Sequence, residues 1–187
     1  MTSPRAPGRG KVLSMLWKLR LLWYRIDKAS FAFAMFFAAI VGSLVFALTA
    51  VHAERDERNA RVREFHARHL ECLARNVYYE ARGESTAGQY AVAEVTMNRK
   101  ASPHYPKTVC EVVYQREAFS WTGMGRIDEP AGDAWERAVK IAEDVYYERR
   151  PRALHPGVTH FHATYVQPDW SKERQRVARI GRHIFYR

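Results

Sequence analysis

The sequence contains neither internal repeats nor low-complexity tracts, and this absence excludes solenoid, propeller and other repeat architectures. It also lacks a basic run interleaved with aromatic residues and any nucleic-acid recognition motif. Its net charge of +10 therefore does not indicate a nucleic-acid partner. Cysteine is limited to Cys72 and Cys110, so the chain can form at most one internal disulfide. No motif calls for a cofactor.

Charged residues are absent from one long stretch near the N-terminus. Residues 31–51 are apolar apart from Gly42, Ser43 and Thr49. At about 1.5 Å per residue, a helix of this length crosses a hydrocarbon core of about 30 Å. We therefore predict a transmembrane helix over residues 31–51.

The charges before this helix predict its orientation. Residues 1–28 carry seven Lys and Arg side chains against one acidic residue, Asp27. By the positive-inside rule, residues 1–30 stay in the cytoplasm and the chain after the helix is exported. We expect a single-pass protein of the inner (cytoplasmic) membrane, with its folded domain in the periplasm or extracytoplasmic space. A cleaved signal peptide is the alternative, because residues 51–53 suit a signal peptidase, but the long basic segment favours an uncleaved signal anchor.

Two further segments follow the predicted membrane helix. Residues 52–69 are rich in charged side chains and are expected to form a helical stalk. Residues 70–187 are long enough for one folded domain, and they hold both cysteines. In an oxidising compartment a cysteine pair is more often bridged than free. A Cys72–Cys110 disulfide would stabilise the domain by about 3–4 kcal/mol, and two free buried thiols are the alternative.

Hydrophobic periodicity predicts a mainly helical α+β domain with a small β-sheet. One helix ends near Ala81 with Gly83 as its C-cap, a second covers residues 87–99, and a third begins near residue 133. Residues 158–166 alternate and are rich in β-branched and aromatic side chains, which indicates a strand.

The predicted starts of the second and third helices rest on capping boxes. Thr86 with Gln89 fits the first box, and Asp133 with Glu136 fits the second. Residues 122–132 are expected to form the loop before the third helix.

Glu80 is the most informative residue of the first helix. Leu73 and Val77 precede it by seven and three residues, so Glu80 falls on or beside the buried face. A carboxyl group that leaves water is harder to ionise, which raises its pKa. A protonated carboxyl near neutral pH is what general-acid cleavage of a glycosidic bond requires. A solvated Glu80, or one paired with Arg82, is the plainer interpretation.

Several sequence blocks, taken in their order, carry a resemblance to a known family. The first runs from Leu73 through the Glu-Ala-Arg-Gly-Glu motif of residues 80–84 and continues over residues 88–99. The later blocks are residues 105–106, 109–115, 119–121, 160–166, 168–170 and 180–187. From about Glu71 to the last residue, the chain resembles the SleB-like cell wall hydrolase family, which includes spore-cortex lytic enzymes.

The resemblance implies a lysozyme-like fold that acts on the glycan strands of peptidoglycan, with residues 70–187 as the catalytic domain. In that family the first Glu of the motif is the catalytic acid, and it corresponds to Glu80. The chain differs from the spore enzymes because it has a membrane segment in place of their separate peptidoglycan-binding repeat domain. This difference argues against a role in spore germination.

One carboxylate is sufficient for a lytic transglycosylase, in which the muramic acid C6 hydroxyl attacks C1 and closes a 1,6-anhydro ring. The resemblance favours this reaction at the MurNAc-GlcNAc bond. Hydrolysis of the same bond is the alternative, and a conventional hydrolase needs a second carboxylate. Glu84 is close in sequence, but we expect Glu84 and Arg82 to give structural support, with Glu84 bonded to backbone amides or to Arg82.

Sugar binding requires flat apolar surfaces and polar groups that match hydroxyls. We predict substrate contacts from Gln115, Phe119, Ser120, Trp121, His162 and Tyr165, with Thr164 and Trp170 as further candidates. Core packing is the competing interpretation for the aromatic members. Tyr165 is expected to supply a hydroxyl and His162 a secondary polar contact. These two residues lie on opposite faces of the predicted strand, so both reach one cleft only if the strand is twisted or lies at a sheet edge.

Two histidines raise a metal alternative. His160 and His162 are two apart on one strand and, with His183 or Glu80 as third ligand, could bind the zinc of an amidase that cuts the muramoyl–alanine bond. This spacing is common and no further ligand pattern accompanies it, so no metal site is predicted. A non-catalytic wall-binding protein is the last alternative. The expected partners are therefore peptidoglycan glycan strands and, through the N-terminal helix, the membrane.

Overall fold

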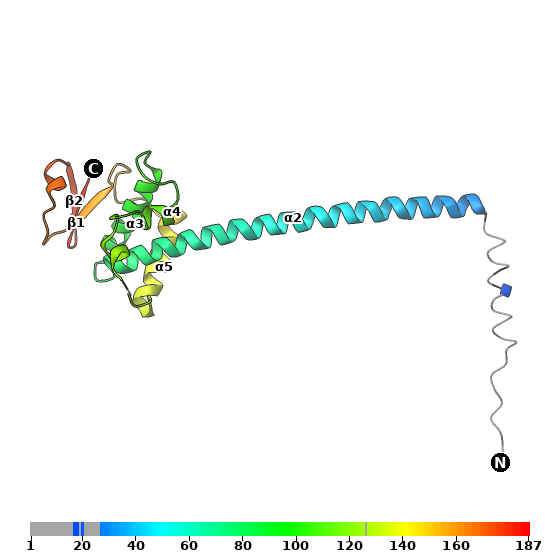
Figure 1. The fold of residues 1–187 in the computed structure, drawn as a ribbon, viewed down its shortest axis with the longest axis horizontal. Helices are drawn as coiled ribbons and strands as arrows, with labels where there is room; N and C mark the ends of the chain where they lie inside the picture. The colour runs from blue at the N-terminus through cyan, green and yellow to red at the C-terminus, as the bar shows by residue number, and fades with distance from the viewer. Residues whose placement is uncertain (1–16, 19, 21–26, 126) are drawn as a thin grey trace, which may run out of the picture. The chain divides into compact units, whose positions relative to one another are not determined.

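The computed structural model describes residues 17, 18, 20, 27–125 and 127–187 (Figure 1). Over these residues the fold is mainly helical with one small sheet, which confirms the predicted fold class. The elements in chain order are α2 (Lys28–Ala81), α3 (Thr86–Ala101), α4 (Val109–Val113), the 3-10 helix η1 (Ser120–Gly123), α5 (Gly132–Tyr146), β1 (His160–Ala163), the 3-10 helix η2 (Asp169–Lys172), β2 (Arg176–Ile180) and β3 (His183–Tyr186).

The chain divides into two compact units, Met1–Asn59 and Ala60–Arg187. The predicted segment limits at residues 30, 51 and 69 stay predictions. Most of the predicted basic segment, residues 1–30, lies outside the described residues.

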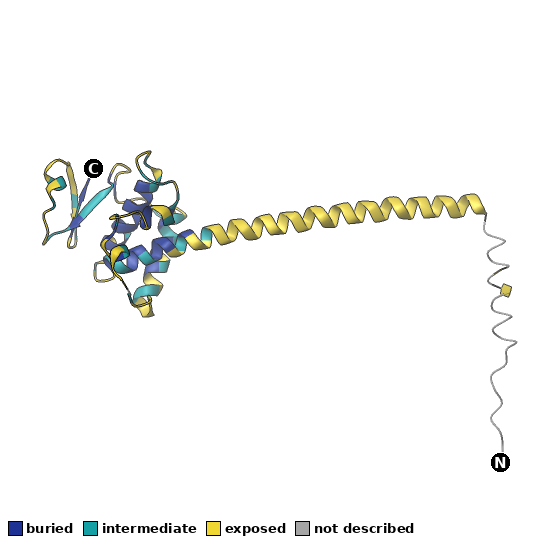
Figure 2. Cartoon of the chain, viewed as in Figure 1, coloured by how far each residue is buried: buried dark blue, intermediate teal, exposed yellow. Residues whose placement is uncertain are grey.

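Helix α2 is continuous, but its two parts have different environments. Its side chains are exposed from Lys28 to Phe65, the yellow part of α2 in Figure 2, and they are mostly buried from His69 onward. The predicted stalk, residues 52–69, is helical throughout. By length and composition α2 is able to cross a membrane, and a signal sequence would meet the same criteria.

The last turns of α2 form the centre of the folded unit. Leu73 and Val77 are fully buried there, and they pack in one cluster with Ala93 of α3 and Ile141 of α5. Removing a side chain such as Leu73 or Ile141 from water contributes about 1.5–3 kcal/mol. The apolar stripe that precedes Glu80 in the sequence is therefore what fixes the end of α2 within the domain.

Both predicted capping boxes are wrong in detail. The N-cap of α3 is Ser85, whose hydroxyl accepts a hydrogen bond from Gly88 N at 3.3 Å. Gln89 does not reach back to its helix start but donates to Glu84 O at 3.0 Å. Helix α5 follows Ala131, which makes no side-chain cap. Ser85 and Thr86 are adjacent and both suit an N-cap, so the choice between them depends on tertiary context.

The sheet is antiparallel in the order β1-β3-β2, so β1 lies at an edge. The predicted strand 158–166 is shorter in the structure, because the chain turns after Ala163 and Val166 N donates back to Ala163 O. The hairpin of β2 and β3 was not assigned from the sequence. Its two-residue turn begins with Gly181 at φ +57°, which suits glycine because no Cβ opposes a positive φ.

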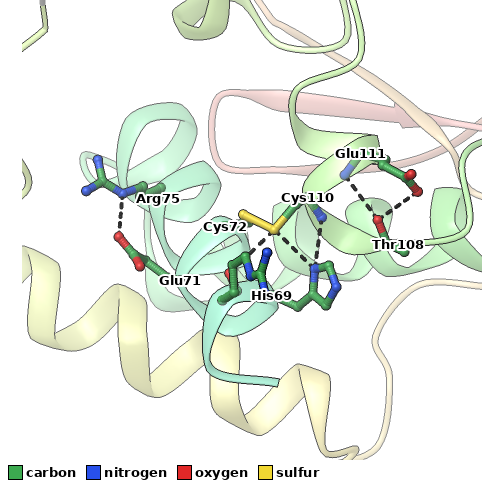
Figure 3. The surroundings of a disulfide bond; sticks show 8 residues. His69, Glu71, Cys72, Arg75, Thr108, Cys110 and Glu111 are labelled. Atoms are coloured by element: carbon green, nitrogen blue, oxygen red, sulfur yellow. Dashed lines mark hydrogen bonds and ion pairs between the residues drawn. A yellow bond between two sulfur atoms is a disulfide. The ribbon is translucent and has the colours of Figure 1, made fainter. Parts of the chain in front are cut away.

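The predicted disulfide is present and joins α2 to α4 (Figure 3). Cys72 and Cys110 have a Cα–Cα distance of 5.3 Å. His69 lies one turn before Cys72, and its Nδ1 accepts a hydrogen bond from Cys110 N at 3.4 Å. Burial lowers the pKa of His69, which keeps the ring neutral and able to accept. Thr108 caps α4 by accepting from Glu111 N at 3.3 Å, so the second cysteine stands on a fixed helical turn.

Candidate active site

Glu80 lies in the last turn of α2, at the edge of a hollow of about 420 Å³. The hollow is enclosed by the end of α2, the end of α3, the segment before η1, and strands β1 and β3. Its lining residues are Tyr79, Glu80, Arg99, Ala118, Phe119, Ser120, Phe161, His162, Ala163, Tyr165, Val166 and His183. Segments about a hundred residues apart in sequence therefore surround one carboxyl group.

The environment of Glu80 holds its proton more tightly than water would. Burial raises the pKa of its carboxyl, while hydrogen bonds from Ser120 and the charge of Arg99 act in the opposite direction. The Ser120 hydroxyl donates to Glu80 Oε1 at 3.4 Å. The pKa of Glu80 remains above its ordinary value, which is the direction that a general acid needs.

Arg99 is a buried cation beside this carboxyl, and it is not among the site residues predicted from the sequence. Its guanidinium donates to two carbonyls, Thr159 O at 2.8 Å and Ala118 O at 3.2 Å, and it lies over the ring of Phe119. Within the described residues it forms no ion pair, so its charge is not neutralised by contact. Arg99 ends the sequence block of residues 88–99, and a cation at a buried position of a helix was the available signal.

The predicted aromatic contacts divide between the hollow and the core. Phe119 lines the hollow but is buried, with the guanidinium of Arg99 on its face. Trp121 does not line this hollow: it is 6% exposed, it stacks on Tyr79, and its indole N–H donates to Asn76 Oδ1 at 2.9 Å. Trp121 also borders a neighbouring hollow with Tyr79 and Ser120. These contacts favour the competing interpretation, core packing, and the substrate contact predicted for Trp121 stays a prediction.

Gln115 was also predicted to contact substrate, but it does not line the Glu80 hollow. Its side chain is exposed in the turn that follows α4, and its carbonyl accepts from Ala118 N at 3.0 Å. Trp170 packs against His162 and Tyr186 instead of lining the hollow. Sequence proximity to Ser120 or His162 does not determine which way a side chain points.

His162 and Tyr165 both line the hollow, as the edge position of β1 allows. Tyr165 is 84% exposed at the rim. His162 is buried, and its ring nitrogens are engaged with Ala163 O and with the Tyr186 hydroxyl, each at 2.9 Å. Tyr165 is therefore accessible to a ligand, whereas His162 supplies a fixed ring surface.

Glu84 is held away from this hollow, by Arg182 and not by Arg82. Its Oε2 accepts from Arg182 N at 2.9 Å and its Oε1 from Arg182 Nε at 2.7 Å. The expected bond to a backbone amide is thus present. The alternative partner, Arg82, is exposed and lies over the ring of Tyr78 at 4.9 Å. Among the residues that line the hollow, Glu80 is the one carboxylate.

The two histidines of the metal alternative are committed to other partners. His160 Nδ1 lies 2.9 Å from Thr159 Oγ1, and its Nε2 lies 3.4 Å from the Tyr105 hydroxyl. In the part of the chain that the structure describes, no three His, Cys, Asp or Glu side chains are grouped to hold a metal ion. His183 was the suggested third ligand, and it lines the hollow at Glu80. Its Nδ1 is buried and has no hydrogen-bond partner among the described residues.

Comparisons with known proteins match this chain to cell wall hydrolases and spore cortex-lytic enzymes. A family model described as Cell Wall Hydrolase matches residues 83–186, a range that begins just after Glu80. The chain is 36% identical to the spore cortex-lytic enzyme of Halalkalibacterium halodurans, over 62% of this chain and 34% of that protein. It is 34% identical to the spore cortex-lytic enzyme of Bacillus subtilis, over 62% of this chain and 36% of that protein. The chain thus spans about a third of the length of these curated relatives.

Two solved structures are similar to the folded unit. The catalytic domain of the Bacillus cereus SleB protein superposes with a TM-score of 0.53 at 29% identity, covering 64% of this chain and 89% of that one. The catalytic domain of the germination-specific lytic transglycosylase SleB from Bacillus anthracis gives a TM-score of 0.54 at 29% identity, covering 64% and 93%.

Proposed function

This chain belongs to the cell wall hydrolase family, and we propose that it is a membrane-anchored lytic transglycosylase that cleaves the MurNAc-GlcNAc bond of peptidoglycan. Glu80 is the single general acid and base. The observation that carries this proposal is one half-buried carboxyl, with a raised pKa, in a hollow that no second carboxylate lines among the described residues.

The reaction has two proton transfers through the same side chain. Protonated Glu80 first donates its proton to the glycosidic oxygen, and the C1–O bond breaks as the GlcNAc leaves. The resulting carboxylate then takes the proton of the muramic acid C6 hydroxyl, whose oxygen bonds to C1 and closes the 1,6-anhydro ring. Because the nucleophile belongs to the same sugar, it competes well with water. Glu80 ends the cycle protonated, and no water is consumed.

Ser120 and Arg99 support the charged half of this cycle. The Ser120 hydroxyl donates to Glu80 Oε1, and the positive charge of Arg99 favours the carboxylate. Fixed donors and charges that face a developing anion stabilise it without reorganisation. Burial thus favours the acid before cleavage, and Ser120 with Arg99 limits the cost of the anion after it.

A conventional hydrolase of the same bond would require a second carboxylate, for which Glu84 is the candidate. A retaining hydrolase places two carboxyl groups about 5–5.5 Å apart and an inverting one about 6.5–9.5 Å apart. Glu84 is the nearest acidic residue in sequence, but both of its oxygens accept hydrogen bonds from Arg182. The similar domain from Bacillus anthracis belongs to a lytic transglycosylase, which supports the same choice.

The proposed location rests on α2. We place residues 31–51 in the inner membrane as an uncleaved anchor, which leaves the folded domain on the periplasmic or extracytoplasmic side, where the wall is. A reporter fused after residue 60 should be active only if exported. A mature protein whose N-terminus lies near Ala53 would show that a signal peptide is cleaved instead.

The test is mass spectrometry of the fragments that the detergent-purified full chain releases from sacculi. We compare the wild type, Glu80→Gln and Glu71→Gln, the last being a matched control because Glu71 is exposed on the same helix. Anhydro-muropeptides from the wild type and from Glu71→Gln, but not from Glu80→Gln, are expected.

Each other product would reject part of the proposal. Reducing-end muropeptides would mean hydrolysis at the same bond. Freed stem peptides that disappear with a chelator would mean a zinc amidase, and sacculus binding without release would mean a wall-binding protein. Full activity of Glu80→Gln would remove Glu80 from the reaction.

A further inference from the structure

A second hollow, of about 730 Å³, lies on another part of the folded unit. It is formed by the turn after α3, the segment that leads into β1, Arg174 before β2 and Arg187 after β3. Its lining includes Ser102, Tyr105, Thr159, His160, Arg174 and Arg187. It is larger than the hollow at Glu80, and the proposed reaction does not use it.

The charge of this hollow is positive. The side chains of Arg174 and Arg187 line it, and none of the side chains found to line it is acidic. In the described part of the chain Arg174 makes no ion pair, and Arg187 Nε donates to the neutral Gln175 Oε1, at 2.7 Å. Lys107 does not line the hollow, but its ammonium donates to the carbonyl of a lining residue, Ser102 O, at 2.8 Å. Cations without acidic partners that share one hollow attract an anion.

The neutral polar side chains of the hollow lie within hydrogen-bonding distance of one another. His160 Nε2 lies 3.4 Å from the Tyr105 hydroxyl and its Nδ1 lies 2.9 Å from Thr159 Oγ1. Burial, together with the charges of Arg174 and Arg99, lowers the pKa of His160 to about 4, so its ring is neutral at pH 7. The attraction for an anion at neutral pH therefore comes from the arginines, while His160 and Tyr105 offer a polar wall.

The two hollows are adjacent along one strand. Residues 159 and 160 line the positive hollow, and residues 161–163 line the hollow at Glu80. Arg99 connects them, because it lines the Glu80 hollow and donates to Thr159 O while its guanidinium lies 5.6 Å from the ring centre of Tyr105. Consecutive residues of β1, His160 and Phe161, thus line the two hollows, and Arg99 contacts lining residues of both.

We propose that the hollow of Arg174 and Arg187 binds a carboxylate of the stem peptide carried by the muramic acid at the cleavage site. This subsite rests on the proposed function, because the bond cut there belongs to the sugar that bears the peptide. The stem peptide leaves that sugar through its lactyl group and carries several carboxylates. An arginine is suited to such a group because its planar guanidinium presents parallel N–H donors.

The decisive experiment compares two substrates: glycan strands that carry stem peptides and the same strands after an amidase has removed them. The quantity measured is the ratio of kcat/KM for the two substrates, with full-length enzyme. The variants are Arg174→Gln, Arg174→Gln combined with Arg187→Gln, and Arg176→Gln. Arg176 is the matched control, because it is exposed, lies two residues from Arg174 and does not line the hollow.

The wild type should prefer peptide-bearing strands. Arg174→Gln should reduce that preference by about fivefold, mainly through KM, the double variant should reduce it further, and Arg176→Gln should keep the wild-type ratio. Equal ratios in all four proteins would overturn the subsite. If the wild type cuts neither substrate, the proposed function itself is wrong, and the two failures are thus distinguishable.

A second measurement uses only the wild-type protein, so its result does not depend on whether the variants fold. Free stem peptide is added to the wild type as an inhibitor, alongside the same peptide with its carboxylates converted to amides. Inhibition by the acid form but not by the amide form is expected. Equal inhibition by both forms, or by neither, would show that carboxylates are not what the hollow recognises.

Discussion

Glu84 and Arg182, which are 98 residues apart in sequence, form a two-point contact that fastens the β2–β3 hairpin to the turn between α2 and α3. The Arg182 amide and its Nε each donate to one oxygen of the Glu84 carboxylate, whose side chain is 7% exposed. Gly181, the residue before Arg182, lies so close to this carboxylate that an added Cβ would collide with Glu84 Oε2. Glu84 thereby positions His183, which lines the hollow at Glu80.

Replacing Glu84 by Gln should lower the free energy of unfolding of the folded domain by about 2 kcal/mol at pH 7. Gln has one acceptor oxygen in place of two, so the variant loses one of the two hydrogen bonds and leaves either the Arg182 amide or its Nε without an acceptor. Urea unfolding of the full chain in detergent measures the change, with Glu71→Gln as the control, because Glu71 is exposed and pairs within α2. A loss no larger than that of the control would show that the contact does not hold the hairpin.

The same contact predicts a pH dependence. Burial alone would raise the pKa of Glu84, but the hydrogen bonds from Arg182 outweigh it and hold the pKa below its ordinary value. A carboxyl with a depressed pKa in the folded state stabilises fully above its unfolded pKa, about 4.3, and the stabilisation is lost as the pH falls through the folded value. The difference between wild type and Glu84→Gln should therefore be full at pH 7 and shrink below about pH 4.

The disulfide should contribute about 4 kcal/mol, because it closes a loop with a sequence separation of 38. Replacing both Cys72 and Cys110 by Ser should lower the free energy of unfolding by about this amount. Reduction of the wild type by dithiothreitol should give the same loss, and the double variant should not respond to the reductant. A reduced wild type as stable as the oxidised protein would contradict this prediction.

The sequence predicted the backbone framework better than the composition of the site. The stripe of Leu73 and Val77 placed Glu80 correctly beside the buried face, because a local period of 3.6 residues needs no knowledge of distant segments. The β2–β3 hairpin was not assigned, although Gly181 was a turn signal, because its short strands gain their stability from each other and from the contact with Glu84.

The contacts within the site join residues that are far apart in sequence, and a local sequence pattern does not predict such contacts. The position of Arg99 beside Glu80 could be recognised only from the structure. Its hydrogen-bond partners are the carbonyls of Ala118 and Thr159, which lie in other segments of the chain. Trp121 was expected to bind sugar, but its N–H had a buried acceptor in Asn76, four residues before Glu80. From the sequence alone, an aromatic side chain near a motif is equally compatible with core packing and with ligand binding in a cleft.

The core position of Trp121 predicts a stability effect. Trp121→Phe should lower the free energy of unfolding by about 1–3 kcal/mol, because Asn76 Oδ1 then lacks its buried donor. The matched control is Trp135→Phe on α5, since Trp135 is only partly buried and no hydrogen bond of its indole is observed within the described residues. If Trp121→Phe instead left stability unchanged and raised KM, Trp121 would be a sugar contact, as the sequence suggested.

The hydroxyl of Ser120 should tune the pH range of the enzyme. Glu80 must be protonated to act as the acid, so kcat/KM falls as the pH rises through its pKa. Burial raises that pKa, and the hydrogen bond from Ser120 lowers it. Ser120→Ala removes the lowering contribution, so the alkaline fall of the profile should move to higher pH, with the plateau changed by less than about tenfold.

Thr122→Val is the matched control for this experiment. Its hydroxyl is close in sequence but donates to Phe119 O at 2.8 Å and does not contact Glu80, so its profile should coincide with that of the wild type. A shift of the Ser120→Ala profile to lower pH would mean that Ser120 favours the protonated acid. An unchanged profile would mean that the Ser120 hydroxyl does not lower the pKa of the group whose ionisation limits cleavage.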